Sequence, residues 1–507
     1  MTSASLPSTP LPRALFWIAA IYALAWSLVP PFLAPSFPLD VVESLGWGRE
    51  WQWGTYKHPP LPPIALHVFW VAFGRFGPFI LSQLCVGLTL WLVWLTACRL
   101  VSRDRALIGT VLTMGVVFYT RPALEFNHNI AQMPFWAGIC YFYLAAWQDG
   151  KLRQWLALGL LAGVGLLCKY SIGLLLACLA LFTVLTPARS VLRQPGPWLS
   201  IGAMALVFAP HALWLQQNDW LPFAYAQGRA AKVGSSPQMG ALSFLLTQML
   251  NHLPLLLVVL FAWARTRFTK QLPPVQPGWH IHSSQPRYLL LIALAPGLLL
   301  VLVGLLAGVR LRDMWGVPIW PFTGLLVASL LPTAWLASMR PYLLRGITVW
   351  LVLISLLSGS YLAYVHDWRK RPVRSDWPAA ALAQQANQTW NQLSTCPLNT
   401  VAGDAWTAGL IAIHTPSQPS VLLFGDPRFT PWVTAERVQR HGALWAWRPE
   451  DAEDGEPAPV AVLQDLGSRP DMRMQEGTWS IPWPRAQKQQ PLVVQWRAYV
   501  PAACERR

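Results

Sequence analysis

Hydrophobic residues dominate the chain from its start to about residue 363, in runs separated by short polar or charged segments. Runs of about 18 or more apolar residues predict membrane-spanning helices, because lipid offers the backbone no hydrogen-bond partner. The pattern therefore predicts a mainly α-helical, polytopic membrane protein with about 11 transmembrane helices. The predicted spans are residues 14–33, 78–98, 106–120, 129–147, 152–168, 170–186, 198–215, 241–264, 288–308, 317–336 and 343–363.

The first run follows Arg13 and has two interpretations. It could be a cleaved signal peptide or an uncleaved first helix. The run is long and ends in Pro-Pro-Phe-Leu without a small-x-small cleavage site. These features favour an uncleaved helix.

The distribution of Lys and Arg indicates which loops are cytoplasmic. Residues 152–186 could form one kinked helix or two helices, and the choice reverses the side of every later loop. With two helices and a cytoplasmic N-terminus, 13 cations fall in inside loops, as the positive-inside rule requires. This arrangement places Lys169 at the outer surface. The inside cations are Arg99, Arg103, Arg105, Lys151, Arg153, Arg189, Arg193, Arg265, Arg267, Lys270, Arg287, Arg340 and Arg345.

Residues 364–507 have a soluble composition and, after eleven spans, lie outside the membrane. Strand-like and helix-like segments alternate here, which predicts a small α/β domain. We therefore divide the chain into a transmembrane domain (1–363) and an extracytoplasmic α/β domain (364–507). Cys396 and Cys504 in the second domain could pair in an oxidising compartment or remain free. The segments are 398–402 (strand), 404–414 (helix), 421–424 (strand), 433–441 (helix) and 443–447 (strand).

Composition narrows the classes of function. The net charge is +16, and residues 1–363 carry 23 Lys and Arg against 8 Asp and Glu. The basicity thus belongs to the membrane part, and no basic run lies on a soluble face, which argues against nucleic-acid binding. We find no P-loop, no Gly-rich dinucleotide motif and no Ser-centred nucleophile elbow.

The predicted outside loops hold more charge than the topology rule allows. Six of the eight acids of the membrane part lie there, together with nine cations. An anionic ligand at the outer surface, such as a phosphate, would explain the cations. Pairing with lipid headgroups is an equal alternative for Arg49, Arg75 and Arg121. The remaining outside cations are Lys57, Lys169, Arg229, Lys232, Arg310 and Arg312, and the acids are Asp40, Glu43, Glu50, Glu125, Asp219 and Asp313.

The first outer loop is the richest in candidate chemistry. Asp40 and Glu43 are three residues apart and share a face if the segment is helical. A carboxylate there could act as a general base, although Asp40 could also cap the helix. Lys57 and His58 precede two prolines, which fix the direction of this basic elbow.

Other outer loops add polar groups. Glu125, Asn127 and Asn129 could bind sugar hydroxyls, although Asn127 or Asn129 could instead cap the next helix. A metal ion could be held by His58, Glu43 or His128, but no close spacing of ligands supports a metal site. Whether a divalent cation is needed therefore stays open.

These pieces in their order resemble the GT-C glycosyltransferases, most of all family 39, which includes protein O-mannosyltransferases and lipid A aminoarabinose transferases. The resemblance covers about residues 10–330. It rests on Asp40-x-x-Glu43, Lys57-His58-Pro59-Pro60-Leu61, the Asn127/Asn129 loop, Leu167-Cys168-Lys169-Tyr170 and Arg310-x-Arg312-Asp313-x-Trp315-Gly316.

The resemblance implies a GT-C fold and an inverting sugar transfer at the outer face of the plasma membrane. The donor would be a sugar on a polyprenyl phosphate, and the acceptor a lipid, a glycan or a protein. Asp40, with Glu43, would supply the base. Lys57, His58, Lys169, Arg310 and Arg312 would hold the donor phosphate, and Glu125, Asn127 and Asn129 would bind sugar or acceptor.

Two departures and two competing functions accompany this interpretation. Lys57-His58 stands where aminoarabinose transferases tend to carry Glu-Lys, and Glu43 replaces the second acid of the common Asp-Glu pair. A transporter or flippase of a polar lipid is an alternative, but it predicts ionisable residues within the spans and an internal repeat. A structural assembly subunit would leave the outer charges unexplained.

Overall fold

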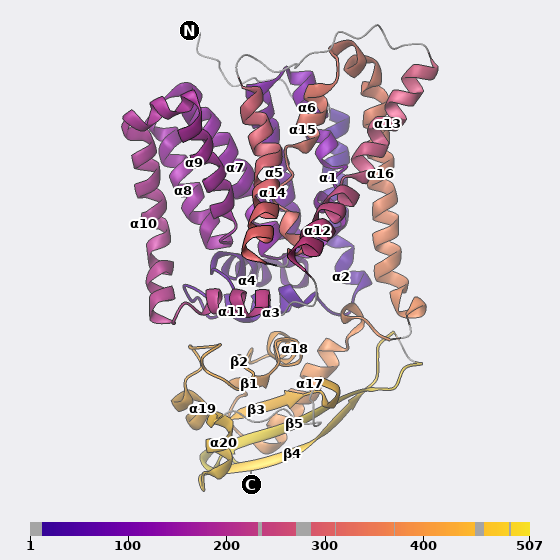
Figure 1. The fold of residues 1–507 in the computed structure, drawn as a ribbon. Helices are drawn as coiled ribbons and strands as arrows, with labels where there is room; N and C mark the ends of the chain where they lie inside the picture. The colour runs from indigo at the N-terminus through magenta and orange to yellow at the C-terminus, as the bar shows by residue number, and fades with distance from the viewer. Residues whose placement is uncertain are drawn as a thin grey trace.

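A bundle of helices forms one end of the molecule and a five-stranded sheet the other (Figure 1). The computed structural model describes residues 13–231, 236–269, 285–309, 311–369, 371–451, 461–485 and 488–506. The long axes of most bundle helices run in a common direction. These helices are α1 (Arg13–Leu28), α5 (Gly77–Leu100), α6 (Arg103–Thr113), α7 (His128–Asp149), α8 (Leu152–Cys168), α9 (Ile172–Leu185), α10 (Pro195–Gln217), α12 (Pro237–Asn251), α13 (Leu253–Phe268), α14 (Pro286–Ala307), α15 (Thr323–Leu330) and α16 (Thr333–Trp368).

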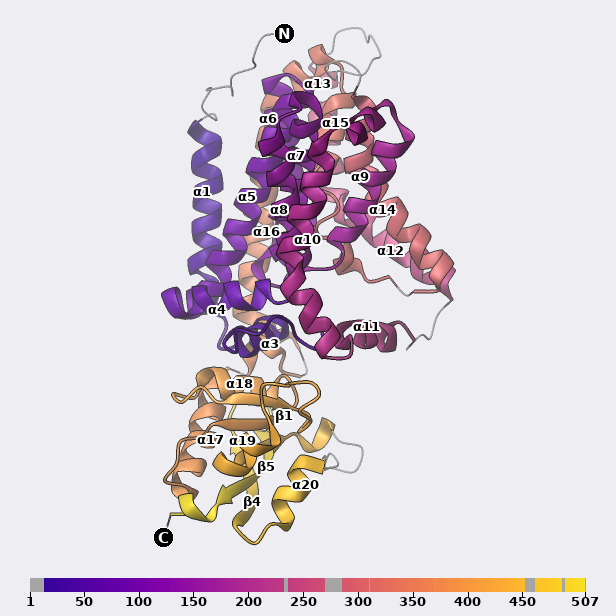
Figure 2. The same ribbon diagram turned by 90° about the vertical axis from the view of Figure 1, so that its left-hand side faces the viewer.

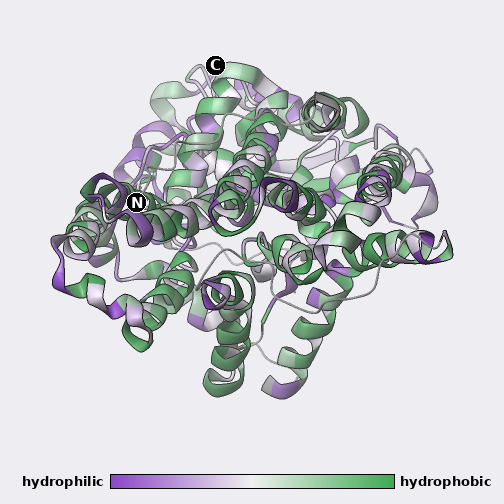
Figure 3. Ribbon diagram, turned by 90° about the horizontal axis from the view of Figure 1, so that it is seen from above, coloured by the Kyte–Doolittle hydropathy of each residue, from purple (hydrophilic) through white to green (hydrophobic). Residues whose placement is uncertain are grey.

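The outside of the bundle is apolar. Leu206 on α10, Leu306 on α14 and Val349 on α16 are all more than 60% exposed. Viewed along the bundle, much of the helical ribbon has the colour of hydrophobic residues, with polar residues interspersed (Figure 3). Exposed side chains of this kind are stable against lipid but not against water. The chain is thus a multi-pass membrane protein.

The length and apolarity of the helices set limits on the number of spans. Among the described residues, five helices are long and apolar enough to cross a membrane, and up to eight spans result if each of three bent pairs counts as one. A further apolar helix, α8, is shorter. The count of about 11 stays a prediction.

The stretch 152–186 forms two helices. α8 ends at Cys168, and α9 begins at Ile172. Lys169 between them has an extended backbone, with φ −165° and ψ 139°. A single kinked helix is therefore excluded, and Lys169 lies at a helix end rather than within a span.

Two other predicted spans differ from the structure. The stretch 241–264 is divided at His252 into α12 and α13, which meet at a 44° bend. Pro254 causes this break, because proline lacks the N–H that a continuing helix needs. The predicted loop between 336 and 343 is also wrong, because α16 is continuous there and the chain breaks earlier, at Pro332.

Short helices lie across the bundle at the end that faces the sheet. They are α3 (Leu39–Gly48), α4 (Leu61–Phe73) and α11 (Leu221–Ala231), which Figure 2 shows between the long helices and the sheet. The sequence predicted loops at the positions of α4 and α11. Pro62 and Pro63 open α4, where the first turn needs no N–H donors and tolerates proline.

The C-terminal unit extends from η6 (Arg374–Asp376) to η8 (Ala502–Cys504). Its sheet has the order β2-β1-β3-β5-β4, in which β1, β2 and β3 are parallel and β5 is antiparallel to both its neighbours. The predicted boundary at 363/364 falls inside α16. The elements of the unit are α17 (Ala379–Leu393), β1 (Thr400–Gly403), α18 (Thr407–His414), β2 (Ser420–Leu423), α19 (Ala435–His441), β3 (Ala443–Trp447), α20 (Ala461–Ser468), β4 (Met472–Ile481) and β5 (Leu492–Pro501).

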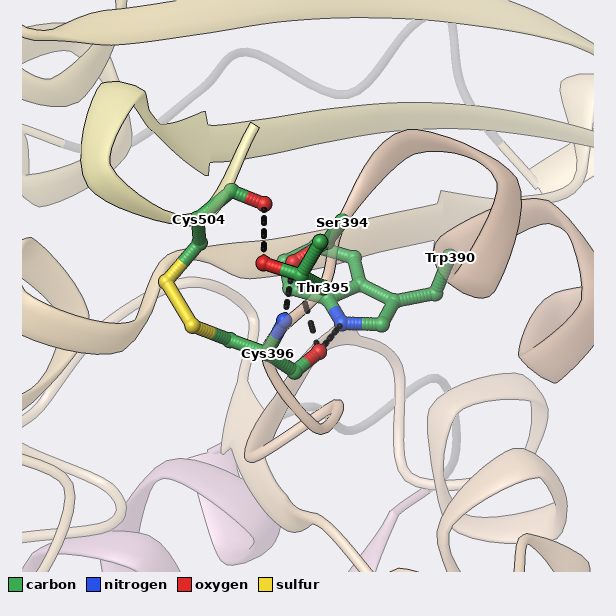
Figure 4. Close-up of a disulfide and its surroundings, with 5 residues drawn as sticks. All are labelled: Trp390, Ser394, Thr395, Cys396 and Cys504. Carbon is green, nitrogen blue, oxygen red and sulfur yellow. Dashed lines mark hydrogen bonds between the residues drawn. A yellow bond between two sulfur atoms is a disulfide. The ribbon is translucent and has the colours of Figure 1, made fainter. Parts of the chain in front are cut away.

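A disulfide joins Cys396, which follows α17, to Cys504, which follows β5 (Figure 4). The indole Nε1 of Trp390 donates to the carbonyl of Cys396 at 2.8 Å, and the hydroxyl of Thr395 donates to that of Cys504 at 3.1 Å. The two sulfurs are 108 residues apart in sequence. The bridge therefore closes nearly the whole C-terminal unit into one loop.

Candidate active site

Helix α3 presents the two acids of the first outer segment. The residue before the helix is Pro38, and no side chain caps its N-terminus. The capping role considered for Asp40 is therefore wrong, although a carboxylate in the first turn still favours the helix dipole. Among the described residues, the Asp40 side chain has no hydrogen bond or ion pair. Its carboxylate is thus available to a substrate.

Thr55 shapes the loop that carries Lys57 and His58. Its hydroxyl accepts hydrogen bonds from the backbone N–H of Lys57 at 3.3 Å and of His58 at 2.9 Å, and donates to the carbonyl of His58 at 3.0 Å. Side-chain turns of this kind are typical of Ser and Thr. The turn folds the loop back over α3, so that Lys57 meets Glu43.

Lys57 and Glu43 form a largely buried ion pair. The Nζ of Lys57 is 2.7 Å from Oε2 of Glu43, and the two side chains are 15% and 6% exposed. Burial alone would lower the pKa of Lys57, but the carboxylate of Glu43 reverses the effect and raises it. Lys57 therefore stays charged, and Glu43 is occupied with holding it rather than free to act as a base.

Lys169 is the second partly buried lysine near Asp40. Its Nζ donates a hydrogen bond to Oδ1 of Asn129. Burial lowers the pKa of Lys169 to about 8; Asp40 opposes this shift and Lys57 adds to it. A cation that is only partly neutralised by its surroundings is suited to an anionic ligand.

Two histidine rings lie close together, tilted by 33°, near these lysines. The rings of His58 and His128 have centroids 4.0 Å apart. Burial lowers the pKa of His58 well below its usual value, and the neighbouring lysines lower it further. His58 is therefore neutral at pH 7 and can donate or accept a hydrogen bond. We call Asp40, Glu43, Lys57, His58, His128, Asn129 and Lys169 the polar cluster.

The predicted sugar-binding residues divide into two groups. Asn127 caps α7, because its Oδ1 accepts from the backbone N–H of Asn129 at 2.8 Å and of Ile130 at 3.3 Å. Asn129 is buried in the polar cluster, whereas Glu125 is exposed beside it. Asn129 and Glu125 therefore remain candidates for substrate contact. The Oδ1 of Asn127 caps α7 and is not available to a sugar hydroxyl.

Of the two arginines predicted to hold the donor phosphate, the structure describes only Arg312. Arg310 lies outside the described residues. Arg312 is exposed at the start of η5 (Asp313–Gly316). Met314 of this turn contacts the Nδ2 of Asn129 at 3.7 Å, which brings the Arg312 segment next to the polar cluster.

Aromatic residues separate the polar cluster from its surroundings. Trp47 and Tyr225 lie 6.0 and 5.9 Å from the Nζ of Lys57, and Tyr56 packs between Tyr225 and Phe429 of the C-terminal unit. The sequence did not identify this group, nor His128 as a neighbour of His58. A threonine three residues before His58 is a sequence signal for the Thr55 turn. Nothing in the sequence indicates that Tyr225 and Phe429 pack near this turn.

The residues present do not fit a metal site. No group of three His, Cys, Asp or Glu that could hold a metal ion occurs in the part of the chain that the structure describes. Of the three suggested ligands, Glu43 is bound to Lys57, and two neutral imidazoles alone are too few donors. We therefore derive no step through a metal ion.

The apolar helical bundle with its polar cluster defines a polytopic membrane protein whose fold has counterparts among solved structures. Two solved structures of ArnT from Cupriavidus metallidurans share the fold. The one bound to undecaprenyl phosphate matches with a TM-score of 0.61 at 14% identity, over 95% of this chain and 98% of ArnT. The apo structure matches with a TM-score of 0.60 at 13% identity, over 97% and 99%.

Sequence comparison points the same way. Residues 57–214 match the family described as dolichyl-phosphate-mannose-protein mannosyltransferase. The lipopolysaccharide core galacturonosyltransferase RgtB of Rhizobium johnstonii is 30% identical over 325 residues, which are 60% of this chain and 63% of RgtB. The resemblance to GT-C glycosyltransferases is thus confirmed.

Proposed function

We propose that this protein is a glycosyltransferase that moves a sugar from a polyprenyl-phosphate donor to a hydroxyl of an acceptor, with inversion at the sugar carbon. One observation carries the proposal. Asp40, a carboxylate without a hydrogen bond or ion pair among the described residues, lies near the partly buried cations Lys57 and Lys169, in a fold shared with an ArnT structure bound to undecaprenyl phosphate.

The geometry supports a single displacement. The oxygen of the acceptor hydroxyl attacks the anomeric carbon of the sugar. At the same time, the carboxylate of Asp40 takes the proton of that hydroxyl. The bond from that carbon to the phosphate oxygen breaks, and the polyprenyl phosphate leaves with the electron pair. Lys57 and Lys169 stabilise the negative charge that develops on the leaving phosphate, which is usually a large term in catalysis. Arg310 and Arg312 are candidates for the same role.

Glu43 acts through Lys57 in this scheme. Its carboxylate keeps the ammonium charged and fixed at 2.7 Å. Glu43 is therefore a positioning residue, and Asp40 alone is the proposed base. This refines the expectation that both acids share the catalytic role.

The sugar is a hexose or a pentose, and the acceptor a lipid, a glycan or a protein. The name of RgtB supports a lipopolysaccharide sugar as the acceptor. The neutral pair His58 and His128 and the amide of Asn129 would offer hydrogen bonds to sugar hydroxyls. Glu125 at the exposed edge could do the same for the acceptor.

The proposed location is the plasma membrane, or the inner membrane of a cell with two, with the polar cluster and the C-terminal unit on the extracytoplasmic side. The disulfide of the C-terminal unit supports this side. Predicted inside cations pair with the two acids that are not in outer loops. Arg99 is 3.1 Å from Asp149, and Arg340 is 3.4 Å from Asp104.

The test is sugar transfer by purified Asp40→Asn protein from a polyprenyl-phosphate donor. The expected loss of rate is at least about 100-fold with donor affinity retained, because removal of a general base slows only the chemical step. Asp219→Asn is a matched control, since Asp219 is an exposed acid of another outer loop. Undiminished transfer by Asp40→Asn would remove Asp40 from the mechanism.

A further inference from the structure

A small cavity, separate from the polar cluster, lies beside the end of α3, between α4 and the C-terminal unit. No residue of the polar cluster lines it. Arg49, His67 and Trp70 form its bundle side, and Ile413 and Gln418 form its other side. The cavity is open to the surface and small, so it fits a compact group rather than a whole sugar.

Arg49 carries an unsatisfied donor into this region. The Nη1 atom of its guanidinium is buried and has no hydrogen-bond partner among the described residues. A buried donor without a partner is unfavourable, which suggests a missing acceptor. A bidentate anion such as a phosphate is the acceptor that a guanidinium binds best.

The neighbouring acid does not supply that acceptor. Glu50 uses Oε1 to accept the hydroxyl of Ser420 at 2.6 Å, and the same Ser420 oxygen accepts from Nη2 of Arg437 at 2.8 Å. The charge of Arg49 is attracted by Glu50 and, more weakly, repelled by Arg437. The region therefore has two cations against one carboxylate, a surplus that an anion would balance.

Helix α4 places exposed apolar side chains beside the cavity. On this crosswise helix, Val68, Val71 and Phe73 are exposed, whereas His67 and Trp70 face the cavity. Trp51 is 59% exposed, and its ring lies 6.4 Å from that of His67. Apolar side chains and Trp on a helix across the end of a bundle are typical of the membrane–water interface, where phospholipid phosphates lie.

We propose that this cavity binds the phosphate of an anionic membrane phospholipid, with Arg49 as the main donor and the exposed face of α4 against the acyl chains. Gln418, at the opposite rim, has a left-handed backbone with φ 45° in the turn between α18 and β2, where its N–H donates to the carbonyl of Thr415 at 2.9 Å. Because both parts of the chain line the cavity, a bound lipid would join α4 to the C-terminal unit.

Native mass spectrometry of the delipidated full-length protein in mild detergent tests the proposal. Phosphatidylglycerol, phosphatidylcholine and inorganic phosphate are titrated in parallel. We expect one phosphatidylglycerol to bind more tightly than phosphatidylcholine, and Arg49→Gln to weaken it about tenfold, the loss expected for one charge-assisted hydrogen bond. Arg49→Lys, which keeps the charge, should restore part of the affinity.

Arg75→Gln is the matched control. Arg75 is another predicted outside cation, but its guanidinium lies over the rings of Phe32 and Phe76 and lines no cavity described for the chain. The control should bind phosphatidylglycerol like the unaltered protein. Thermal unfolding of each variant in detergent shows whether it is folded.

Three outcomes would overturn the assignment. Equal retention of phosphatidylglycerol by Arg49→Gln and the unaltered protein would exclude Arg49 as the donor. Equal binding of phosphatidylcholine would exclude selection of an anionic headgroup. Binding of inorganic phosphate without competition by phosphatidylglycerol would assign the cavity to a soluble anion instead of a lipid.

Discussion

At the scale of single residues, the electrostatics of the polar cluster separate roles that the sequence could only group together. Spacing predicts that Asp40 and Glu43 share a helix face, and both lie on α3. Spacing does not predict that Glu43 is taken by Lys57, because that pair depends on the Thr55 turn. Which of the two acids is paired therefore depends on the tertiary structure and could not be predicted from the sequence.

Lys169 makes donor binding dependent on pH. Its pKa of about 8 means that the charged fraction falls steeply as the pH rises from 7 to 9. The donor is a phosphodiester that carries one negative charge throughout this range, and the second pKa of a polyprenyl phosphate monoester is about 6, so the main titrating group between pH 7 and 9 is on the protein. The affinity for a polyprenyl phosphate should fall roughly tenfold between pH 7 and 9, measured by fluorescence titration in nanodiscs.

The matched variants for this prediction are Lys169→Arg and Lys169→Gln. Arginine keeps its charge, so its affinity should be constant from pH 7 to 9. Glutamine should bind weakly at every pH. A pH dependence that persists unchanged in both variants would place the titrating group elsewhere.

The two asparagines at the start of α7 should respond differently to alanine. Asn127→Ala removes a helix cap, which should lower the free energy of unfolding by about 1 kcal/mol and leave transfer nearly unchanged. Asn129→Ala removes the hydrogen-bond partner of Lys169 and should lower the transfer rate. Thermal unfolding and a transfer assay on both variants distinguish the capping role of Asn127 from the role of Asn129 at the site. An Asn127→Ala protein with normal stability and slow transfer would contradict this assignment.

At the scale of elements, the sequence predicts best where periodicity and length are strong. Five segments of the C-terminal unit are found as β1, α18, β2, α19 and β3. The strands β4 and β5 were not predicted, because β4 at the sheet edge is mostly exposed and lacks a clear alternation. Helix α4 was missed because the prolines at its start resemble a loop signal, whereas the spacing of Asp40 and Glu43 had suggested a helix at α3.

The packing of α18 on α3 ties the C-terminal unit to the candidate active site. A Cβ at Gly409 would lie 2.7 Å from a methyl of Val42, too close for either to stay in place. Gly409→Ala should therefore lower the free energy of unfolding by about 1–3 kcal/mol despite the better helix propensity of alanine. Thermal unfolding and limited proteolysis between the two parts measure the effect.

Gly467→Ala is the control within the same unit. Gly467 is also helical, but its Cβ would meet only ordinary contacts at 3.7 Å and beyond. This change should be neutral or slightly stabilising. Equal effects of the two substitutions would mean that the α3–α18 contact is less tight than described.

At the scale of the whole molecule, charge along the chain predicts the arrangement well. Among the described residues, Asp40, Glu43, Lys57 and Lys169 of the predicted outer loops gather in the polar cluster, and the two-helix interpretation of 152–186 is confirmed. The number of spans could not be fixed from sequence, because bends at Pro254 and elsewhere interrupt runs that hydropathy treats as continuous.

The disulfide should stabilise the C-terminal unit without affecting the bundle. A Cys396→Ser, Cys504→Ser double variant should lose about 2–5 kcal/mol in that unit. Proteolysis of this unit should quicken while the helical bundle stays resistant. The five cysteines described as free lie in bundle helices. They are present in the unaltered protein and in the double variant, so their labelling by a thiol reagent serves as an internal reference for the bundle.

The central claim is that this chain consumes a polyprenyl-phosphate-linked sugar with Asp40 as the base. The most direct measurement is mass spectrometry of the lipid-linked sugars in cells that lack the protein. The donor lipid should accumulate there, return to its normal level when the unaltered gene is restored, and remain high with Asp40→Asn at equal expression. No accumulation of any lipid-linked sugar, or its clearance by Asp40→Asn, would contradict the account.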